Sequence, residues 1–231
     1  MRYQSIIFDL DGTLTDSGEG IMNSAKYAFE QLGIAVPELH NLRKMVGPPL
    51  TYSFPLFGVP EAQVDEAIRL YRDQYNNRGG KYQNHVYPGI EEMLSRLQQA
   101  GCRLHVATSK PEPLAQEILE GFALMTYFDI VAGASWDRSR ETKGEVLQYL
   151  LGCTGNAGEA VMIGDTHFDV IGAHELNLPA IGVTWGYGLK EEMDGSELDN
   201  PVSSLNCYLH LYKNCTTFAL GHAHSGSTVP T

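Results

Sequence analysis

Short apolar runs recur along the chain, and each is followed by turn residues and then by the spacing of a helix. This alternation of strand and helix predicts an α/β fold, in which a parallel sheet carries helices on both faces. The expected strands are Ser5 to Phe8, Arg103 to Ala107, Phe128 to Ala132, Ala160 to Ile163 and Ala180 to Val183.

The first two expected strands are separated by about ninety residues, whereas a strand–helix–strand unit needs only about 30. Between them, Gly18 to Leu32 and Glu61 to Tyr75 each place their apolar residues on one helical face. Gly47 to Leu50 predicts a tight loop, and Arg78 to Gly80 predicts a hinge. We therefore expect a small helical cap to be inserted here.

The chain is thus predicted to be a Rossmann-like α/β core of residues 1–15 and 85–194, with a helical cap formed by residues 16–84. After Asp194 the sequence is rich in Ser, Asn, Thr and Gly without a sustained period, so residues 195–231 are expected to form an atypical tail. His222 and His224 lie there without a third ligand beside them, and we interpret them as part of the chain end, not as a metal site.

Composition and charge narrow the range of functions. With 43% hydrophobic and 19% charged residues, the 231-residue chain is typical of a globular protein. Its net charge of -12 argues against nucleic acid as a partner. A small anionic substrate would need local positive charge, from a metal ion, a lysine or helix N-termini.

The number and spacing of the cysteines indicate the cellular compartment in which the protein acts. The four of them form no CxxC pair and are too few to staple a secreted chain of this length, which favours a reducing environment. No signal peptide is evident after Met1, and no apolar run approaches membrane-spanning length. We therefore expect a soluble cytoplasmic protein without a membrane partner, acting as a monomer or homodimer.

The segment from Phe8 to Asp16, FDLDGTLTD, carries the strongest chemical signal. Asp9 and Asp11 follow an apolar strand, at the end where binding sites of open parallel sheets lie. Carboxylates this close repel unless one is protonated or a cation lies between them, which favours a hard metal such as Mg²⁺. Gly12 allows the backbone to turn and direct amides towards a phosphate. An ordinary strand with an Asp-Gly turn is the alternative, but the complete DxDGT string rarely arises by chance.

A second acidic pair follows the strand expected at Ala160 to Ile163. Asp165 and Asp169 are four residues apart, so both can face one point from the first turn of a helix. By itself the pair is equally well explained without a metal: Asp165 could be the N-cap of the helix, and Asp169 could be favoured by the helix dipole in the first turn. Together with the first motif, it favours a metal site.

Positive charge and hydroxyl groups complete the candidate site. Lys143 begins a predicted helix, where it opposes the helix dipole and so invites a specific role, although an exposed lysine is the ordinary alternative. Lys110 is the competing cation. Thr108 and Ser109 end a strand just before Pro111, where a hydroxyl and free amides suit a phosphate oxygen, although Ser109 could simply cap the helix.

The motifs and their order resemble those of the haloacid dehalogenase (HAD) superfamily, in particular its phosphoglycolate phosphatase branch with a type 1 helical cap. This resemblance implies a Mg²⁺-dependent phosphatase that hydrolyses small phosphate monoesters through an aspartyl-phosphate. Asp9 would be the nucleophile. Asp11 would protonate the leaving oxygen, later activate water, and offer its main-chain carbonyl to Mg²⁺. A dehalogenase would lack the second aspartate, so Asp11 favours phosphoryl chemistry.

The same resemblance assigns the remaining roles. It implies that the metal is held by Asp9, Asp11, Asp165 and Asp169, and that the phosphate is held by Thr108, Ser109 and Lys143. The resemblance extends from about Tyr3 to about Gly188. Family members usually close with another short strand and a helix, which residues 206–231 do not resemble, so an edge strand is expected to be lost or altered.

The sequence is compatible with several substrates. Arg43, Lys44 and the loop from Gly47 to Leu50 are the candidates for holding the leaving group, and each could equally be exposed surface. Phosphoglycolate, a 5′-nucleotide or another small ester fits the motifs. A sugar phosphate phosphatase or a mutase such as β-phosphoglucomutase is also compatible, and an inactive phosphate-binding protein is the alternative from another functional class.

Overall fold

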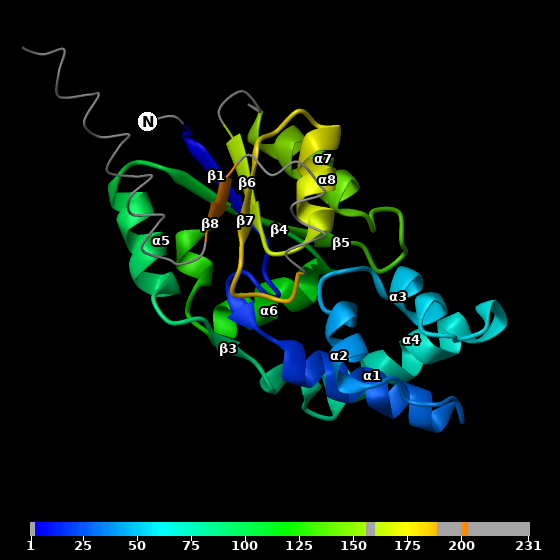
Figure 1. The fold of residues 1–231 in the computed structure, drawn as a ribbon. Helices are drawn as coiled ribbons and strands as arrows, with labels where there is room; N and C mark the ends of the chain where they lie inside the picture. The colour runs from blue at the N-terminus through cyan, green and yellow to red at the C-terminus, as the bar shows by residue number, and fades with distance from the viewer. Residues whose placement is uncertain (1–2, 156–159, 189–199, 203–231) are drawn as a thin grey trace, which may run out of the picture.

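The computed structural model describes residues 3–155, 160–188 and 200–202. At its centre is a six-stranded parallel sheet with the order β5-β4-β1-β6-β7-β8 (Figure 1). The strands are β1 (Ser5–Phe8), β4 (Arg103–Pro111), β5 (Ile130–Ala134), β6 (Ala160–Gly164), β7 (Ala180–Val183) and β8 (Asn200–Val202). The predicted α/β class is confirmed.

Helices cover both faces of the sheet, because successive residues of a strand point to opposite sides. In β1, Ile7 belongs to one buried cluster, together with residues of α7 and α8, whereas Phe8 belongs to another, together with residues of α5 and α6. Burial on both faces explains why the strands are continuous apolar runs in the sequence. The four helices are α5 (Ile90–Gln99), α6 (Glu112–Gly121), α7 (Lys143–Thr154) and α8 (His167–Glu175).

The register of the sheet brings the carboxyl ends of three strands together. Phe8 at the end of β1 lies between Val106 of β4 and Ile163 of β6. The residues that follow these strands, including Asp9 and Asp165, therefore lie along one edge of the sheet.

Three of the five predicted strands have different boundaries in the structure: β4, β5, which also ends later at Ala134, and β6, which ends at Gly164 instead of Ile163. β4 continues beyond Ala107 to Pro111, with a register shift against β5 between Thr108 and Pro111. β5 begins at Ile130, because the 3-10 turn η5 (Met125–Tyr127) ends directly before Phe128.

The segment between β1 and β4 is mainly helical. The two predicted helices are present as α1 (Gly18–Gln31) and α4 (Val64–Arg72), which pack against each other. The 3-10 turn η2 (Glu61–Gln63) precedes α4, and the π-helical turn η3 (Asp73–Asn77) follows it. The other elements are α2 (Leu39–Leu42), η1 (Arg43–Met45), α3 (Leu50–Leu56) and η4 (Gly80–Tyr82).

Aromatic side chains fill the interior of these inserted helices. The rings of Phe29 and Phe54 have centroids 5.6 Å apart, and those of Phe54 and Tyr71 are 6.3 Å apart. The short α2 and α3 were not predicted, because neither is long enough to show a helical period and α3 contains Pro55. The predicted loop at Gly47 is present, with φ +105°, and gives way to α3 at Leu50.

Two short antiparallel strands, β2 (Thr15–Asp16) and β3 (His85–Val86), pair where the chain enters and leaves the inserted helices. The amide of Tyr87 extends this pairing by donating to the carbonyl of Leu14 at 3.1 Å. Strands of two residues show no alternation in the sequence, so they were not predicted. This pairing holds the segment that enters the inserted helices next to the segment that leaves them.

The region after Asp194, in which no element was predicted, contributes β8. This strand extends the sheet beside β7, and Gly182 is paired with Pro201. Of the two expectations for the edge strand, that it is lost or that it is altered, loss does not hold for residues 200–202, where a short strand is present. His222 and His224 lie outside the described residues. Among the helices of the described ranges, none combines the length and apolar character needed to cross a membrane.

Candidate active site

The DxDGT segment turns sharply after β1 and places its first two carboxylates in buried positions. The amide of Asp9 donates to the carbonyl of Ile163 at 2.8 Å, which continues the sheet pairing for one more residue. Gly12 has φ +88°, and a Cβ there would lie 2.2 Å from Asp165 Oδ2. Glycine is therefore required both by the turn and by the approach of Asp165. Asp9 and Asp11 are 2% and 6% exposed.

Three carboxylates meet at this edge of the sheet. Asp9, Asp165 and Asp169 are all buried and have ligand oxygens within 4.8 Å of one another. Carboxylate oxygens are the donors that Mg²⁺ prefers, so this set suits a hard divalent cation. The carboxylate of Asp11 is not part of the set, so its predicted metal contact could come only from its main-chain carbonyl.

Lys143 supplies the positive charge beside this acidic set. Its ammonium lies 2.8 Å from Asp9 Oδ1 and 2.8 Å from Asp169 Oδ1, and it donates to the carbonyl of Ala107 at 2.9 Å. A capping box formed by Thr142 and Glu145 begins α7 and fixes the lysine in its first turn. The sequence-predicted cation is therefore the one that contacts the predicted nucleophile.

Charge within the set remains unbalanced. Burial raises the pKa of Asp9 to about 7 against the opposing effect of Lys143, and burial, followed by Asp169 and Asp9, raises the pKa of Asp165 well above its usual range. Burial alone would lower the pKa of Lys143, but the neighbouring Asp169 and Asp9 outweigh it and raise that pKa. One lysine does not neutralise three carboxylates, so the set favours an added cation or a proton.

The start of α8 explains how the second acidic pair is held. Thr166, not Asp165, is the N-cap, and Asp169 completes a capping box by accepting from the amide and hydroxyl of Thr166 at 3.0 and 2.9 Å. Asp165 accepts from the hydroxyl of Thr13 at 3.2 Å and from the amide of Tyr187 at 2.7 Å. Capping and metal binding are thus compatible, because the Asp169 oxygen that faces Lys143 is not the capping one.

Lys110 lies on the other side of the site. Its ammonium is 3.1 Å from Asp11 Oδ2 and donates to the hydroxyl of Tyr75 at 2.9 Å. The second oxygen of Asp11 accepts from the hydroxyl of Ser17 at 2.5 Å. The two lysines therefore serve different aspartates, and Lys110 does not occupy the position predicted for Lys143.

The predicted phosphate ligands lie at the end of β4. Thr108 is 1% exposed, and its hydroxyl accepts from the amide of Lys110 at 3.2 Å. Ser109 is half-buried and lines the cavity described below. The structure thus brings both residues to the same sheet edge as Asp9.

The loop after β7 contributes residues to which the sequence motifs gave no role. The Tyr187 hydroxyl donates to Asp16 and accepts from the amide of Gly18, while its own amide holds Asp165. A Cβ at Gly186 would lie 2.2 Å from Asp165 Oδ2, so the loop packs tightly on that carboxylate. The glycines of this loop were a sequence signal that could have indicated the contact.

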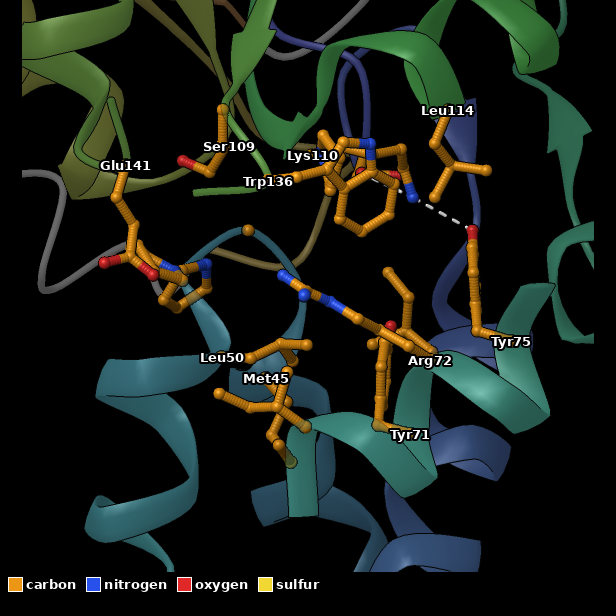
Figure 2. A pocket seen from close by; sticks show the side chains of 18 of the residues that line it. Met45, Leu50, Tyr71, Arg72, Tyr75, Ser109, Lys110, Leu114, Trp136 and Glu141 are labelled. Atoms are coloured by element: carbon orange, nitrogen blue, oxygen red, sulfur yellow. Dashed lines mark hydrogen bonds and ion pairs between the residues drawn. The ribbon is translucent and has the colours of Figure 1, made fainter. Parts of the chain in front are cut away.

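A cavity opens between the sheet edge and the inserted helices (Figure 2). Asp11 and Lys110 line it from the sheet, and the predicted Gly47 to Leu50 loop lines it from the inserted helices. Arg43 and Lys44, the other candidates for holding the leaving group, do not line it. Both are exposed, and Arg43 lies 5.0 Å from the centroid of the Tyr187 ring. Their predicted role is therefore not supported.

Residues 6–183 match the family model described as haloacid dehalogenase-like hydrolase. The chain belongs to this family. It is 42% identical to a 5′-nucleotidase of Pseudomonas aeruginosa, over 84% of this chain and 88% of that protein. It is 32% identical to a phosphoglycolate phosphatase of Agrobacterium fabrum, over 78% and 80% of the two chains. A crystal structure of a predicted phosphatase from Clostridium acetobutylicum superposes with a TM-score of 0.86 at 43% identity, covering 93% of this chain and 99% of that one. The chain is therefore a HAD-family phosphoric monoester hydrolase.

Proposed function

We propose that this phosphatase is Mg²⁺-dependent and hydrolyses small phosphate monoesters through an aspartyl-phosphate on Asp9. The observation that carries the proposal is the buried contact of Asp9 with Lys143 beside the carboxylates of Asp165 and Asp169. Such a site excludes water from a nucleophilic carboxylate while keeping a cation beside it.

The two aspartates of the DxD motif divide the reaction into two displacements. An oxygen of Asp9 attacks phosphorus, the bond from phosphorus to the ester oxygen breaks, and Asp11 gives its proton to the departing alcohol. Water then attacks phosphorus, Asp11 takes a proton from that water, and the bond to Asp9 breaks to release phosphate. The metal held by Asp9, Asp165, Asp169 and the main-chain carbonyl of Asp11 would neutralise charge on the phosphoryl group.

The substrate phosphate would be held mainly by groups of the sheet edge. Thr108 offers a hydroxyl, Ser109 an amide, and Lys143 a charged donor that is already directed at Asp9. Residues 16–84 would act as a cap on the core of residues 1–15 and 85–194. Two contacts between the inserted helices and the loop after β5 support this role: the Thr51 hydroxyl donates to Glu141 at 2.8 Å, and Arg138 pairs with Asp65 at 2.7 Å.

Two substrate candidates follow from the relatives. A phosphoglycolate phosphatase at 32% identity favours a small carboxylic acid ester, and a 5′-nucleotidase at 42% identity favours a nucleotide. Both reactions use the same phosphoryl chemistry. They differ in the alcohol that leaves on the Asp11 side.

The proposed roles of the two aspartates can be separated with an activated aryl phosphate, whose alcohol departs without much protonation. Asp9→Asn should form no phosphoenzyme, because an amide is a poor nucleophile. Asp11→Asn should release up to one equivalent of aryl alcohol in a burst and then stall, since water still needs a base. Mass spectrometry of the quenched protein should find phosphate on the peptide that contains Asp9. Steady turnover by Asp11→Asn at the parental rate, or phosphate on another residue, would refute the assignment.

A further inference from the structure

The cavity between the sheet edge and the inserted helices contains an arginine–tryptophan pair that the phosphoryl chemistry does not use. Asp11 lines this cavity, whereas Asp9, Asp165 and Asp169 do not. Because Asp11 is the proposed donor to the departing alcohol, the cavity lies on the leaving-group side of the site. The residues that line it should therefore indicate which kind of alcohol binds there.

Arg72, at the end of α4, extends into this cavity beneath Trp136, which lies in the loop after β5 (Figure 2). The guanidinium carbon is 4.7 Å from the centroid of the indole ring. Within the described ranges, no hydrogen bond or ion pair engages the Arg72 guanidinium. A half-buried arginine thus offers its N–H donors to the cavity while one of its flat faces is covered by Trp136.

The rest of the lining mixes apolar and polar side chains. Met45, Leu50, Ile68 and Leu114 are apolar, whereas Asn76 and Ser135 offer hydrogen-bonding groups. A pentose can therefore exchange hydrogen bonds to water for bonds to these groups, which lowers the cost of burying it. A short carboxylic acid would place its carboxylate beside Asp11, where Lys110 is already engaged by Asp11 and Tyr75.

The size of the cavity limits which part of the alcohol can enter. It encloses about 90 Å³, compared with about 30 Å³ for one water molecule in the liquid. This suffices for the part of an alcohol next to the phosphate but not for a large ring system. The remainder must lie at the opening, where Trp136 is 44% exposed.

We propose that Arg72 and Trp136 recognise a flat, unsaturated group with hydrogen-bond acceptors, so that the substrates are nucleoside 5′-monophosphates. The pentose occupies the cavity next to Asp11, the base stacks on the exposed indole, and the guanidinium donates to the acceptors of the base. This inference rests on the proposed phosphatase function and adds the class of substrate and the residues that select it.

The test compares kcat/KM for purine and pyrimidine 5′-monophosphates, phosphoglycolate and glycerol phosphate. The parent enzyme should prefer the nucleotides. Trp136→Ala should lower kcat/KM for nucleotides by about 5- to 150-fold, the range expected for loss of one stacked base, mainly through KM. Arg72→Met should also reduce the preference for nucleotides. Tyr149→Ala is the matched control, since Tyr149 is 43% exposed beneath Arg140 at 3.7 Å and does not line the cavity.

Binding gives a readout that does not depend on turnover. A nucleoside, which is the expected product, should quench the fluorescence of the parent protein, and Trp136→Phe should remove most of that quench while Trp185 still reports folding. Thermal melting of each variant identifies any loss of fold.

The outcomes separate the two proposals. Hydrolysis of phosphoglycolate or glycerol phosphate without hydrolysis of nucleotides would overturn the recognition site and leave the phosphatase intact. A nucleotide preference that survives in both Trp136→Ala and Arg72→Met would also overturn it. If no ester is hydrolysed, the proposed mechanism fails, and the quench by nucleoside then decides the recognition site alone: its presence in the parent supports the site, and its absence refutes it.

Discussion

Two lysines are buried at the edge of the sheet, and they are held by different parts of the molecule. Lys143 contacts Asp9, Asp169 and the carbonyl of Ala107, all of which belong to the sheet or to a helix packed on it. None of these contacts involves the inserted helices. The ion pairs and hydrogen bonds that hold Lys143 against the predicted nucleophile are therefore made without the inserted helices.

Lys110 contacts Asp11, but its other partner, Tyr75, comes from the π-helical turn η3 of the inserted helices. The Tyr75 ring is stacked on Tyr71 at 5.7 Å, which connects the pair to the interior of those helices. The position of the predicted acid thus depends on where the inserted helices lie. The contact of Lys143 with Asp9 is thus independent of the inserted helices, whereas the contact of Lys110 with Asp11 is supported by them.

Removal of the metal should have the largest effect on activity. The metal acts on the step in which Asp9 attacks phosphorus, and this step is common to all esters. In excess chelator, phosphate release from every ester should fall to background, since Asp9, Asp165 and Asp169 would face a phosphate dianion with only Lys143 to offset them. The control is restoration of activity by excess Mg²⁺. Full activity in chelator would show that the acidic set serves another purpose.

Lys143→Met should lower kcat by about 10²–10³-fold, the loss typical of one charged donor at a reacting group. The loss should be similar for alkyl and aryl phosphates, because Lys143 contacts the nucleophile and not the acid. Steady-state rates with both esters measure it, and Lys143→Arg tests whether charge alone suffices. A loss confined to alkyl esters would mean that Lys143 supports the acid Asp11 and not the nucleophile Asp9.

Lys110→Met and Tyr75→Phe should have smaller effects that depend on the leaving group. Both remove a contact that positions Asp11, so phosphoenzyme formation from an alkyl ester should slow by up to about 100-fold for Lys110→Met and by less for Tyr75→Phe. Formation from an aryl phosphate should change little. Single-turnover rates with the two esters provide the measurement. Equal losses on both would mean that the pair supports the fold and not the acid.

The pKa of Asp9 predicts how stability changes with pH in the metal-free protein. That pKa rises from 3.8 to about 7 on folding, mainly through burial. Between these values the folded state binds more protons than the unfolded state, so stability should fall as pH rises through this range. Mg²⁺, which favours the ionised carboxylates, should raise the melting temperature more at pH 8 than at pH 5. Asp9→Asn should flatten the metal-free profile, and an unchanged slope in this variant would assign the effect to other groups.

The smallest effect on chemistry is expected from deleting the residues after Asp194. The deletion removes β8 at the sheet edge, so the melting temperature should fall, but no predicted site residue lies there. Activity per folded molecule should be retained. A folded, truncated protein that binds neither metal nor phosphate would show that this region belongs to the site.

The sequence alone was sufficient for the α/β class, for the five strands it predicted and for the two longest inserted helices. These elements have local signals, since buried strands are apolar runs and α1 and α4 repeat their apolar residues with the period of a helix. The candidate residues at the carboxyl ends of β1, β4 and β6 were found for the same reason. Parallel strands bring their carboxyl ends to one edge, so motifs that are distant in the chain could be expected to meet.

Only the tertiary structure decided which cation faces which aspartate and what lines the leaving-group cavity. Tyr75 and Lys110 are 35 residues apart in the chain, and Tyr187 and Asp165 are 22 apart, so neither contact follows a local period. The sequence offered Arg43 either as a residue that holds the leaving group or as exposed surface, whereas the structure places Arg72 in the cavity, because the packing of α1 on α4 determines which faces of the inserted helices meet the sheet. Such packing depends on the shapes of all the side chains together, and a pattern read along the chain does not contain it.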